Sequence, residues 1–382
     1  MPPEWRRLIE SIHDAPPRAV LAVTGGGNSA LNDLLIVPGA SRTVLEAIVP
    51  YAAASVSAWL GRTPDQYCCE ETALAMASVA YRRAQCLETD DGVPLVGIGC
   101  TASIVSDRPK RGEHRAFIAA QSATSTLCLS LVLAKDARDR EEEDFLVGRV
   151  VLAALAIACG LDNIPALELH GTERLATEAE RADPLLAAVW HAAAPLAWSL
   201  PDGRLEPSPL VPPKGLLCGS FNPFHPGHAE LKTAAEQRLA GPVHYELSLA
   251  NVDKPPLDYL TIARRRSQFR DSPLALTHAP TFVEKARVFP GIVFVVGVDT
   301  AERIVHPRYY GGSAEAMQRA LGEIRQAGCR FLVAGRLMKE RFVRLSDISL
   351  PAGVIDLFEE LPPGEFRRDV SSTELRRVES GV

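Results

Sequence analysis

The stretch from residue 215 to residue 239 constrains the fold of this 382-residue chain more than any other. The apolar run Gly-Leu-Leu-Cys is followed at once by a loop rich in glycine and proline, and then by a helical pattern. A strand that leads into a helix through a tight loop is typical of a parallel sheet, and the free N–H groups at the start of such a helix attract anions. Gly227 has no side chain, so its backbone can approach an anion closely. His225 and His228 can converge on the same anion. The stretch therefore predicts a phosphate site.

Short apolar runs alternate with helical patterns on both sides of this stretch. Strands separated by helices favour parallel sheets that helices cover on both faces. We therefore expect two α/β domains, the second a Rossmann-like, doubly wound parallel sheet. The expected strands are 19–23, 93–98, 116–120, 215–218, 293–296 and 331–334. The expected helices lie around residue 31 and over 44–60, 70–83, 173–194, 229–239, 260–269 and 314–327.

Proline marks the boundary between the two domains. Six prolines fall between residues 195 and 213, and a segment of this kind cannot continue a helix. We expect a first domain over 1–170, a helical and proline-rich linker over 171–214, and a second domain over 215–382.

Composition and charge exclude several classes of function. The formal net charge is −6, whereas general nucleic-acid binding needs clustered positive charge. The longest apolar run, 150–160, is too short to span a bilayer, and the first residues lack the apolar core of a secretory signal. We therefore expect a cytoplasmic protein that binds neither nucleic acid nor membrane. The eight cysteines form no C-x-x-C pair, so we expect reduced thiols and no metal site.

A second anion site is expected near the C-terminus, in the segment Asp-Val-Ser-Ser-Thr-Glu-Leu-Arg at 369–376. Ser371 or Ser372 followed by Glu374 is typical of a capped helix start, whose hydroxyls and free amides can donate to an anion. Arg376 then lies on the first turn as a planar donor suited to oxyanions.

Together, these two motifs resemble the nucleotidylyltransferase superfamily, with its H-x-G-H and S-S-T-x-x-R signatures. The Gly-Ser-Phe-Asn-Pro run at 219–223 is similar to that of the nicotinamide mononucleotide adenylyltransferase group. The segment around Asp299 resembles the G-x-D segment near that family's substrate, and the strand that ends before Arg336 resembles one beside its adenine site. The resemblance covers residues 215–380 and implies a nucleotidylyltransferase fold.

The resemblance also implies a reaction. An acceptor phosphate, on nicotinamide mononucleotide or its acid form, would attack the α-phosphate of ATP and expel pyrophosphate without a protein nucleophile. Mg²⁺ would bridge the phosphates, since no carboxylate cluster in the sequence suggests a dedicated cage. The implied catalytic residues are His225, His228 and Arg376. The implied nucleotide-binding residues are Gly219, Ser220, Phe221, Asn222, Gly227, Asp299, Arg336, Ser371, Ser372 and Thr373.

The first half carries a different pattern. Val-Thr-Gly-Gly at 23–26 follows an apolar strand but matches neither G-x-G-x-x-G nor a P-loop. Taken with residues 37–41, Tyr51, 60–61 and 70–76, it resembles the CinA C-terminal domain over 15–165, in a family that includes nicotinamide mononucleotide deamidases.

Three departures from that family concern catalysis. The family's Ser, Lys and Thr are replaced here by Ala22, Val56 and Val96, and apolar side chains can neither attack an amide nor move its protons. We therefore expect a non-catalytic scaffold, and the resemblance implies a homo-oligomer formed through this domain. The residues Thr24–Gly27, with Thr101–Ser103 and Arg108–Arg111, either hold a nucleotide or only form turns.

Two alternative functions stay open. In the first, the second domain transfers an adenylyl or cytidylyl group to another phosphorylated acceptor, such as phosphopantetheine or an alcohol phosphate. Alternatively, the chain is a nucleotide-binding regulator without turnover. Lys254 and Lys285 are either contacts to substrate phosphate or ordinary solvated lysines.

Overall fold

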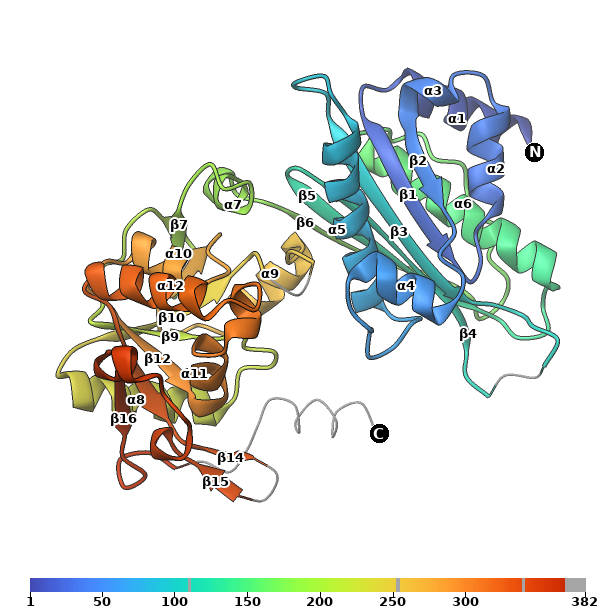
Figure 1. The fold of residues 1–382 in the computed structure, drawn as a ribbon. Helices are drawn as coiled ribbons and strands as arrows, with labels where there is room; N and C mark the ends of the chain where they lie inside the picture. Colours follow the sequence, from blue (N-terminus) through green and yellow to red (C-terminus); the bar gives the residue numbers. More distant parts are fainter. Residues whose placement is uncertain (109–110, 252–254, 339–340, 368–382) are drawn as a thin grey trace. The chain divides into compact units, whose positions relative to one another are not determined.

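The computed structural model describes residues 1–108, 111–251, 255–338 and 341–367. The chain divides into two compact units, formed by Met1–Ala182 with Asp253–Ile262 and by Asp183–Val252 with Ala263–Val382 (Figure 1). Both units are α/β, as the alternation of apolar runs and helical patterns predicts. No helix in the described part of the chain is long and apolar enough to cross a membrane.

The first unit contains a six-stranded sheet. Its strands are β1 (Arg18–Thr24), β2 (Val44–Ile48), β3 (Leu95–Ser103), β4 (His114–Ser122), β5 (Ser125–Leu133) and β6 (Arg174–Arg181), in the order β2-β1-β3-β4-β5-β6. β1 pairs in parallel with β2 and β3, whereas β3 to β6 pair antiparallel. The strands β3 to β6 depart from the parallel pairing that the alternation favours, because a two-residue connection such as that between β4 and β5 allows only an antiparallel hairpin.

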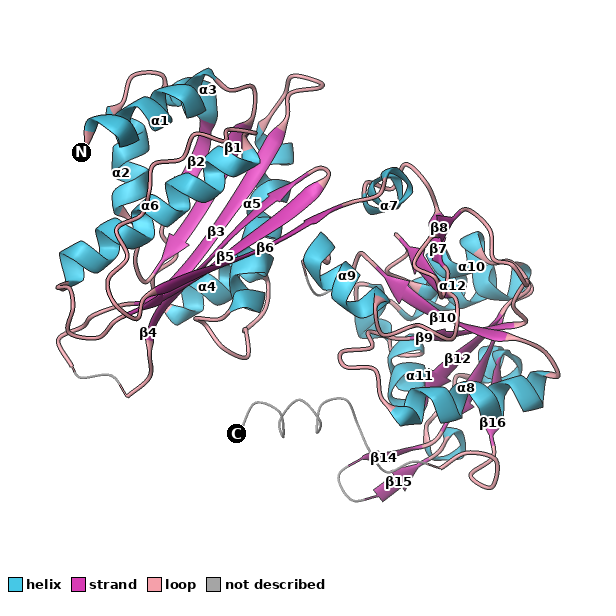
Figure 2. Ribbon diagram, turned by 180° about the vertical axis from the view of Figure 1, so that it is seen from behind, coloured by secondary structure: helices cyan, strands magenta, loops and turns pink. Residues whose placement is uncertain are grey.

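Helices cover both faces of this sheet (Figure 2). One face packs against α1 (Pro3–Asp14), α2 (Ser29–Ile36) and α6 (Arg140–Ala158). The other packs against α4 (Ala53–Leu60) and α5 (Glu70–Leu87). A short helix, α3 (Ala40–Thr43), precedes β2.

Helix α5 lies close against β3 because two glycines leave room for its backbone. A Cβ atom at Gly97 would lie 2.1 Å from the amide nitrogen of Tyr81, and one at Gly99 would lie 2.4 Å from the carbonyl oxygen of Ala73. Any side chain at these two positions would therefore push the helix off the sheet.

Two expected helices differ from the structure. The pattern over 44–60 is divided into β2 and α4, since Pro50 interrupts it. The pattern over 173–194 is divided into β6 and α7 (Pro184–Trp190). Here Asp183 caps the helix by accepting from the amide of Leu185 at 2.8 Å, and the residues before it complete the sheet against β5.

The second unit contains an eight-stranded sheet. Its strands are β7 (Leu196–Ser199), β8 (Leu205–Glu206), β9 (Gly215–Cys218), β10 (Val243–Ser248), β11 (Leu274–Thr277), β12 (Val293–Gly297), β13 (Arg330–Ala334) and β16 (Phe358–Leu361). The order is β16-β13-β12-β9-β10-β11-β7-β8, parallel from β16 to β11 and antiparallel at β7 and β8. The order reverses direction between β9 and β12, which makes that point the topological switch where doubly wound sheets bind ligands.

Helices alternate with these strands, as expected. They are α8 (Pro226–Leu239), α9 (Tyr259–Arg266), α10 (Phe282–Val288), α11 (Val298–Ile304) and α12 (Ala314–Gln326), with 3₁₀ turns at Pro307–Tyr310, Leu345–Asp347 and Ala352–Leu357. Buried residues of α10, α11 and α12 pack against Phe294 and Phe331. A small hairpin of β14 (Arg336–Met338) and β15 (Arg341–Val343) follows β13.

Candidate active site

The second unit brings three sequence-predicted segments to one edge of its sheet. The loop 219–225 follows β9, and Asp299 lies in the first turn of α11 after β12. One residue separates Arg336 from the end of β13. Because β9, β12 and β13 are neighbouring parallel strands, their carboxyl ends meet at the switch point.

The two histidines lie against each other at the start of α8. His225 is the residue before the helix and His228 is on its first turn, and their rings stack with centroids 3.8 Å apart. The backbone N–H of His225 donates to Nδ1 of His228 at 3.2 Å. The amide of His228 in turn donates to the carbonyl of His225 at 2.9 Å.

These contacts fix the protonation state of His228. Nδ1 accepts a hydrogen bond, so in a neutral ring the proton is on Nε2. Burial lowers the pKa of His228 from 6.5 to about 3, with smaller contributions from His225 and the positive charge of Arg336. His228 is therefore a neutral imidazole at physiological pH that presents an N–H donor from the start of a helix.

Asp299 and Arg336 form an ion pair beside the histidines. Nη1 of Arg336 donates to Oδ2 of Asp299 at 3.1 Å, and both side chains keep part of their surface exposed. Gly297 allows this approach, since a Cβ atom there would lie 2.6 Å from Oδ1 of Asp299. The pair gives the site a fixed guanidinium that can still reach a phosphate oxygen.

Aromatic rings hold the loop that precedes the histidines. Phe221 has a positive φ of 46° and its side chain is buried, so contact with a nucleotide would come through its backbone. Its ring packs edge-on against His228, with centroids 5.1 Å apart, and against Phe269 at the same distance. Phe224 stacks on His228 with centroids 5.4 Å apart. Nothing in the sequence distinguishes Phe269 from an ordinary core residue.

Polar contacts complete the support of this loop. Gln268 and Arg265 follow the end of the loop by 43 and 40 residues in the chain, and no sequence pattern connects either of them with it. Arg265 donates to the carbonyl of Ser220 at 2.9 Å, and Gly219 donates to the carbonyl of Glu246 at 3.1 Å. These bonds hold the start of the loop in place.

The lysine predictions have different outcomes. Lys285 is buried, and its Nζ lies 2.5 Å from Oε1 of Glu246, which also accepts from Thr277 at 2.6 Å. Lys285 is thus a buried partner of a carboxylate, so neither a contact to substrate phosphate nor a solvated lysine is the right description. Lys254 lies outside the described residues.

The second anion motif also falls outside the described residues. This concerns Ser371, Ser372, Thr373 and Arg376, whose roles remain predictions. In the first motif, Asn222 is exposed in the loop and Gly227 is buried in the first turn of α8.

In the first unit, two of the three substituted positions meet in an apolar cluster. Ala22 and Val56 are buried together with Leu60 and Met76. Val96 lies in the core on the opposite face of the sheet. The structure therefore brings together the positions of the family's Ser and Lys but fills the space between them with hydrocarbon.

The glycine loop of the first unit is occupied by a carboxylate from its own chain. Oδ1 of Asp144 accepts from the amides of Gly27 and Asn28 at 2.7 and 3.2 Å, and Oδ2 accepts from the amide of Ser29 at 3.0 Å. These amides lie at the start of α2, a position at which helices attract anions. This arrangement favours the prediction that the loop only forms a turn.

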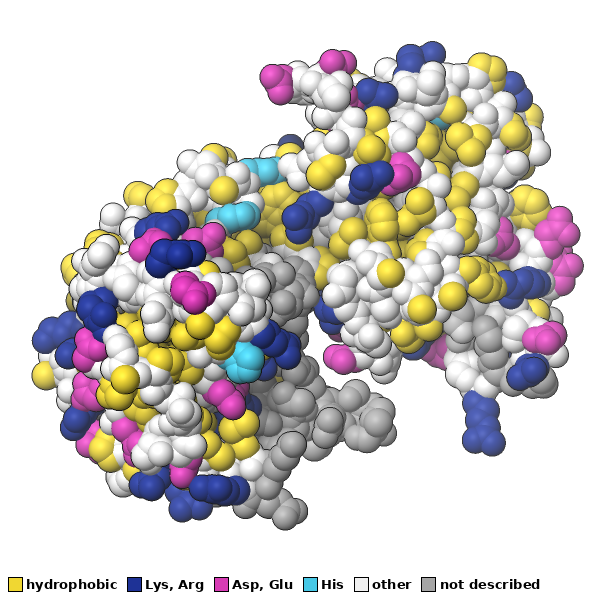
Figure 3. All heavy atoms as spheres, in the orientation of Figure 1, with side chains coloured by type: hydrophobic (Ala, Val, Ile, Leu, Met, Phe, Trp, Pro, Cys, Tyr) yellow, Lys and Arg dark blue, Asp and Glu magenta, His cyan; other side chains and the backbone are white. Residues whose placement is uncertain are grey.

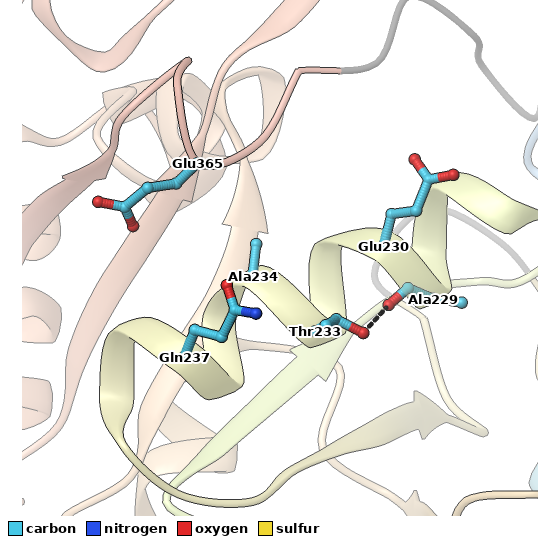
Figure 4. Close-up of a pocket in the computed structure, with 6 residues that line it drawn as sticks. All are labelled: Ala229, Glu230, Thr233, Ala234, Gln237 and Glu365. Carbon is cyan, nitrogen blue, oxygen red and sulfur yellow. Dashed lines mark hydrogen bonds between the residues drawn. The ribbon is translucent and has the colours of Figure 1, made fainter.

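The described part of the second unit also contains a groove. The groove has a volume of about 400 Å³ and runs along α8, and its lining begins at Ala229, directly after His228 (Figure 4). On the face that Figure 3 shows, Lys and Arg are interspersed with Asp and Glu. Among the described residues, no three His, Cys, Asp or Glu side chains are grouped to hold a metal ion.

The sequence matches no protein-family profile and no curated protein. Among solved structures, the chain is similar to the competence/damage inducible protein CihA from Agrobacterium tumefaciens, with 18% identity over 42% of this chain and 94% of that one and a TM-score of 0.31. It is also similar to a competence-damaged protein (CinA) superfamily protein from Escherichia coli, with 16% identity over 41% of this chain and 85% of that one and a TM-score of 0.28. At these values neither likeness says what the chain does.

Proposed function

We propose that the second unit is a nucleotidyltransferase that transfers the adenylyl group of ATP to nicotinamide mononucleotide, or to its acid form, and releases pyrophosphate. The observation that carries the proposal is the state of His228. Its neutral ring lies on the first turn of α8, its Nδ1 accepts from the amide of His225, and its Nε2–H would donate to the ligand. A neutral donor at a helix N-terminus, beside a guanidinium, is suited to a polyphosphate.

The reaction requires the protein mainly to position the two substrates and to stabilise charge on the phosphates. An oxygen of the acceptor phosphate forms a bond to the α-phosphorus of ATP, while the bond from that phosphorus to the bridging oxygen breaks and its electron pair leaves with pyrophosphate. The attacking phosphate is already anionic, so no protein base is needed. His228 would donate to an α-phosphate oxygen as charge shifts during the displacement.

Arg336 and Asp299 would complete the site. Arg336 would contact phosphate or base from the end of β13, and Asp299 keeps the guanidinium in place. Mg²⁺ would neutralise charge between the phosphates, and the site fits an ion held mainly by phosphate oxygens and water, because the described residues offer no cage of three or more ligands. His225 would bind the β- or γ-phosphate, together with the C-terminal segment that contains Arg376.

The first unit is, in our proposal, a scaffold through which the chain self-associates. Ala22 and Val56 fill the deamidase position with hydrocarbon, and Asp144 occupies the glycine loop. Light scattering on the full chain tests the self-association, which predicts a multiple of 41.3 kDa.

Pyrophosphate release from the purified full chain tests the transferase proposal. Wild type is incubated with Mg²⁺ and either ATP or CTP, each paired with nicotinamide mononucleotide, its acid form, phosphopantetheine and an alcohol phosphate, and ammonia is measured in the same wells. His228→Ala is the test variant, and His191→Ala, an exposed histidine at the end of α7, is the matched control.

The proposal expects release with ATP and nicotinamide mononucleotide or its acid, lost in His228→Ala by on the order of a hundredfold or more and retained in His191→Ala. Release only with another pair would keep the mechanism and change the substrate. Nucleotide binding without any release would contradict the transferase and favour a nucleotide-binding regulator.

A further inference from the structure

The side chain of Gln268 connects the backbone of the loop 219–225 with the residues that surround the ring of His228. Oε1 of Gln268 accepts from the amide of Phe224 at 2.7 Å, and Nε2 of Gln268 donates to the carbonyl of Phe221 at 3.2 Å. A third contact, from Nε2 to the carbonyl of Arg265 at 3.4 Å, fixes the amide to its own turn. One oxygen faces an N–H and one nitrogen faces two carbonyls, so the reversed amide would lose all three bonds.

The two residues that Gln268 holds are the ones whose rings enclose His228. Phe221 packs edge-on against the imidazole and Phe224 stacks on it. The next amide along the chain, that of His225, donates to Nδ1 of His228. Two successive N–H groups are thus directed, one to Gln268 and the other to the imidazole.

We propose that Gln268 is a positioning residue of the transferase site, which orients the Nε2–H of His228 by fixing the backbone of Phe221 and Phe224. This inference rests on the proposed function and assigns Gln268 no contact with substrate. If the loop relaxes, the amide of His225 no longer points at Nδ1, the imidazole exchanges between its two tautomers, and the donor is lost for part of the time.

The test compares variants that separate hydrogen bonding from packing. Gln268→Met keeps the length and volume of the side chain and removes its hydrogen bonds. Gln268→Glu keeps an acceptor for the Phe224 amide but cannot donate to Phe221 when ionised. Gln237→Met is the matched control, since Gln237 is exposed on α8. Each full-length variant is measured for melting temperature, for kcat and KM of pyrophosphate release, and for the ¹⁵N imidazole signals of His228 by NMR.

We expect Gln268→Met to lower kcat by on the order of tenfold or more with little change in KM, because the lost bonds act on orientation in the transition state. We also expect its His228 signals to move from a single Nε2–H tautomer toward a mixture. Gln268→Glu should lie between wild type and Gln268→Met, and Gln237→Met should match wild type.

Two results would overturn the inference. One is an unchanged His228 tautomer in a folded Gln268→Met protein, whatever its activity. The other is a loss of kcat that Gln237→Met shares. If the wild type releases no pyrophosphate with any pair, the proposed function fails, and the NMR signals still decide whether Gln268 orients His228. If Gln268→Met does not fold, Gln268→Glu carries the same comparison.

Discussion

The imidazole rings of His225 and His228 stack with centroids 3.8 Å apart, while the backbone of the first residue donates to the ring of the second. Two rings so close cannot both be charged without mutual repulsion. The repulsion adds to burial and to the charge of Arg336 in lowering the pKa of His228. His228 is therefore a neutral hydrogen-bond donor rather than a point charge.

The first prediction concerns pH. The pKa of His228 is lowered from 6.5 to about 3, so between these values the unfolded chain binds a proton that the folded chain does not. Its contribution to stability is present above pH 6.5 and is lost as the pH falls toward 3. We expect the ¹⁵N signals of His228 to stay those of the Nε2–H tautomer from pH 8 to about pH 4. His228→Asn assigns the signals, and a midpoint near pH 6 would contradict the burial described here.

The second prediction concerns Arg336. In Arg336→Met, removal of the positive charge should raise the pKa of His228 and lower pyrophosphate release, since a phosphate donor is lost. Stability should change by no more than about 1 kcal/mol, because the pair with Asp299 is partly exposed to solvent. Arg336→Lys keeps the charge without the planar donor and serves as the control. NMR titration and the release assay measure both effects, and an unchanged pKa in Arg336→Met would be inconsistent with the charge acting on His228.

The third prediction concerns the ion pair beneath the loop. Lys285→Met leaves the carboxylate of Glu246 buried without its cation, which should destabilise the protein by about 3–5 kcal/mol. The double variant Glu246→Gln with Lys285→Met should recover much of that loss. Lys232→Met, which removes a pair within one helix at 2.7 Å, is the control and should cost less than about 1 kcal/mol. Urea unfolding measures all three, and equal losses in Lys285→Met and Lys232→Met would argue against a buried pair.

The sequence predicts best the part of the candidate site whose residues lie close together in the chain. The order of strand, glycine and proline loop, and helix is readable within 25 residues, and the structure places β9, the loop and α8 where that pattern expects them. It could not reveal Gln268, because a glutamine has no distinctive spacing and its partners lie 44 and 47 residues away. For the same reason the sequence predicts Lys285 only as a solvated or substrate-facing lysine, whereas Glu246 pairs with it from 39 residues away.

The direction in which neighbouring strands pair is the second feature that the sequence does not predict. Composition identifies β4 as a strand but does not predict β5, and whether the two pair in parallel depends on the length of the connection and on the chain's path. The charged strand β6 has a helical composition, with one Arg at each end and two Glu between them, and only pairing with β5 makes it extended. Tertiary pairing therefore outweighs local propensity in this segment.

The last prediction tests whether two substitutions can give the first unit deamidase activity. Ala22→Ser with Val56→Lys restores two side chains of the family that this half resembles. Val56 is only 2% exposed and packs with Leu60 and Met76, so a lysine there would place an ammonium group among hydrocarbon without a partner. We expect a lower melting temperature, by several degrees or more, and no ammonia from nicotinamide mononucleotide. Ala22→Ser alone, which adds one hydroxyl, is the matched control and should destabilise less. Ammonia release by the double variant would mean that the apolar cluster opens readily into a catalytic cleft, and would overturn the scaffold role.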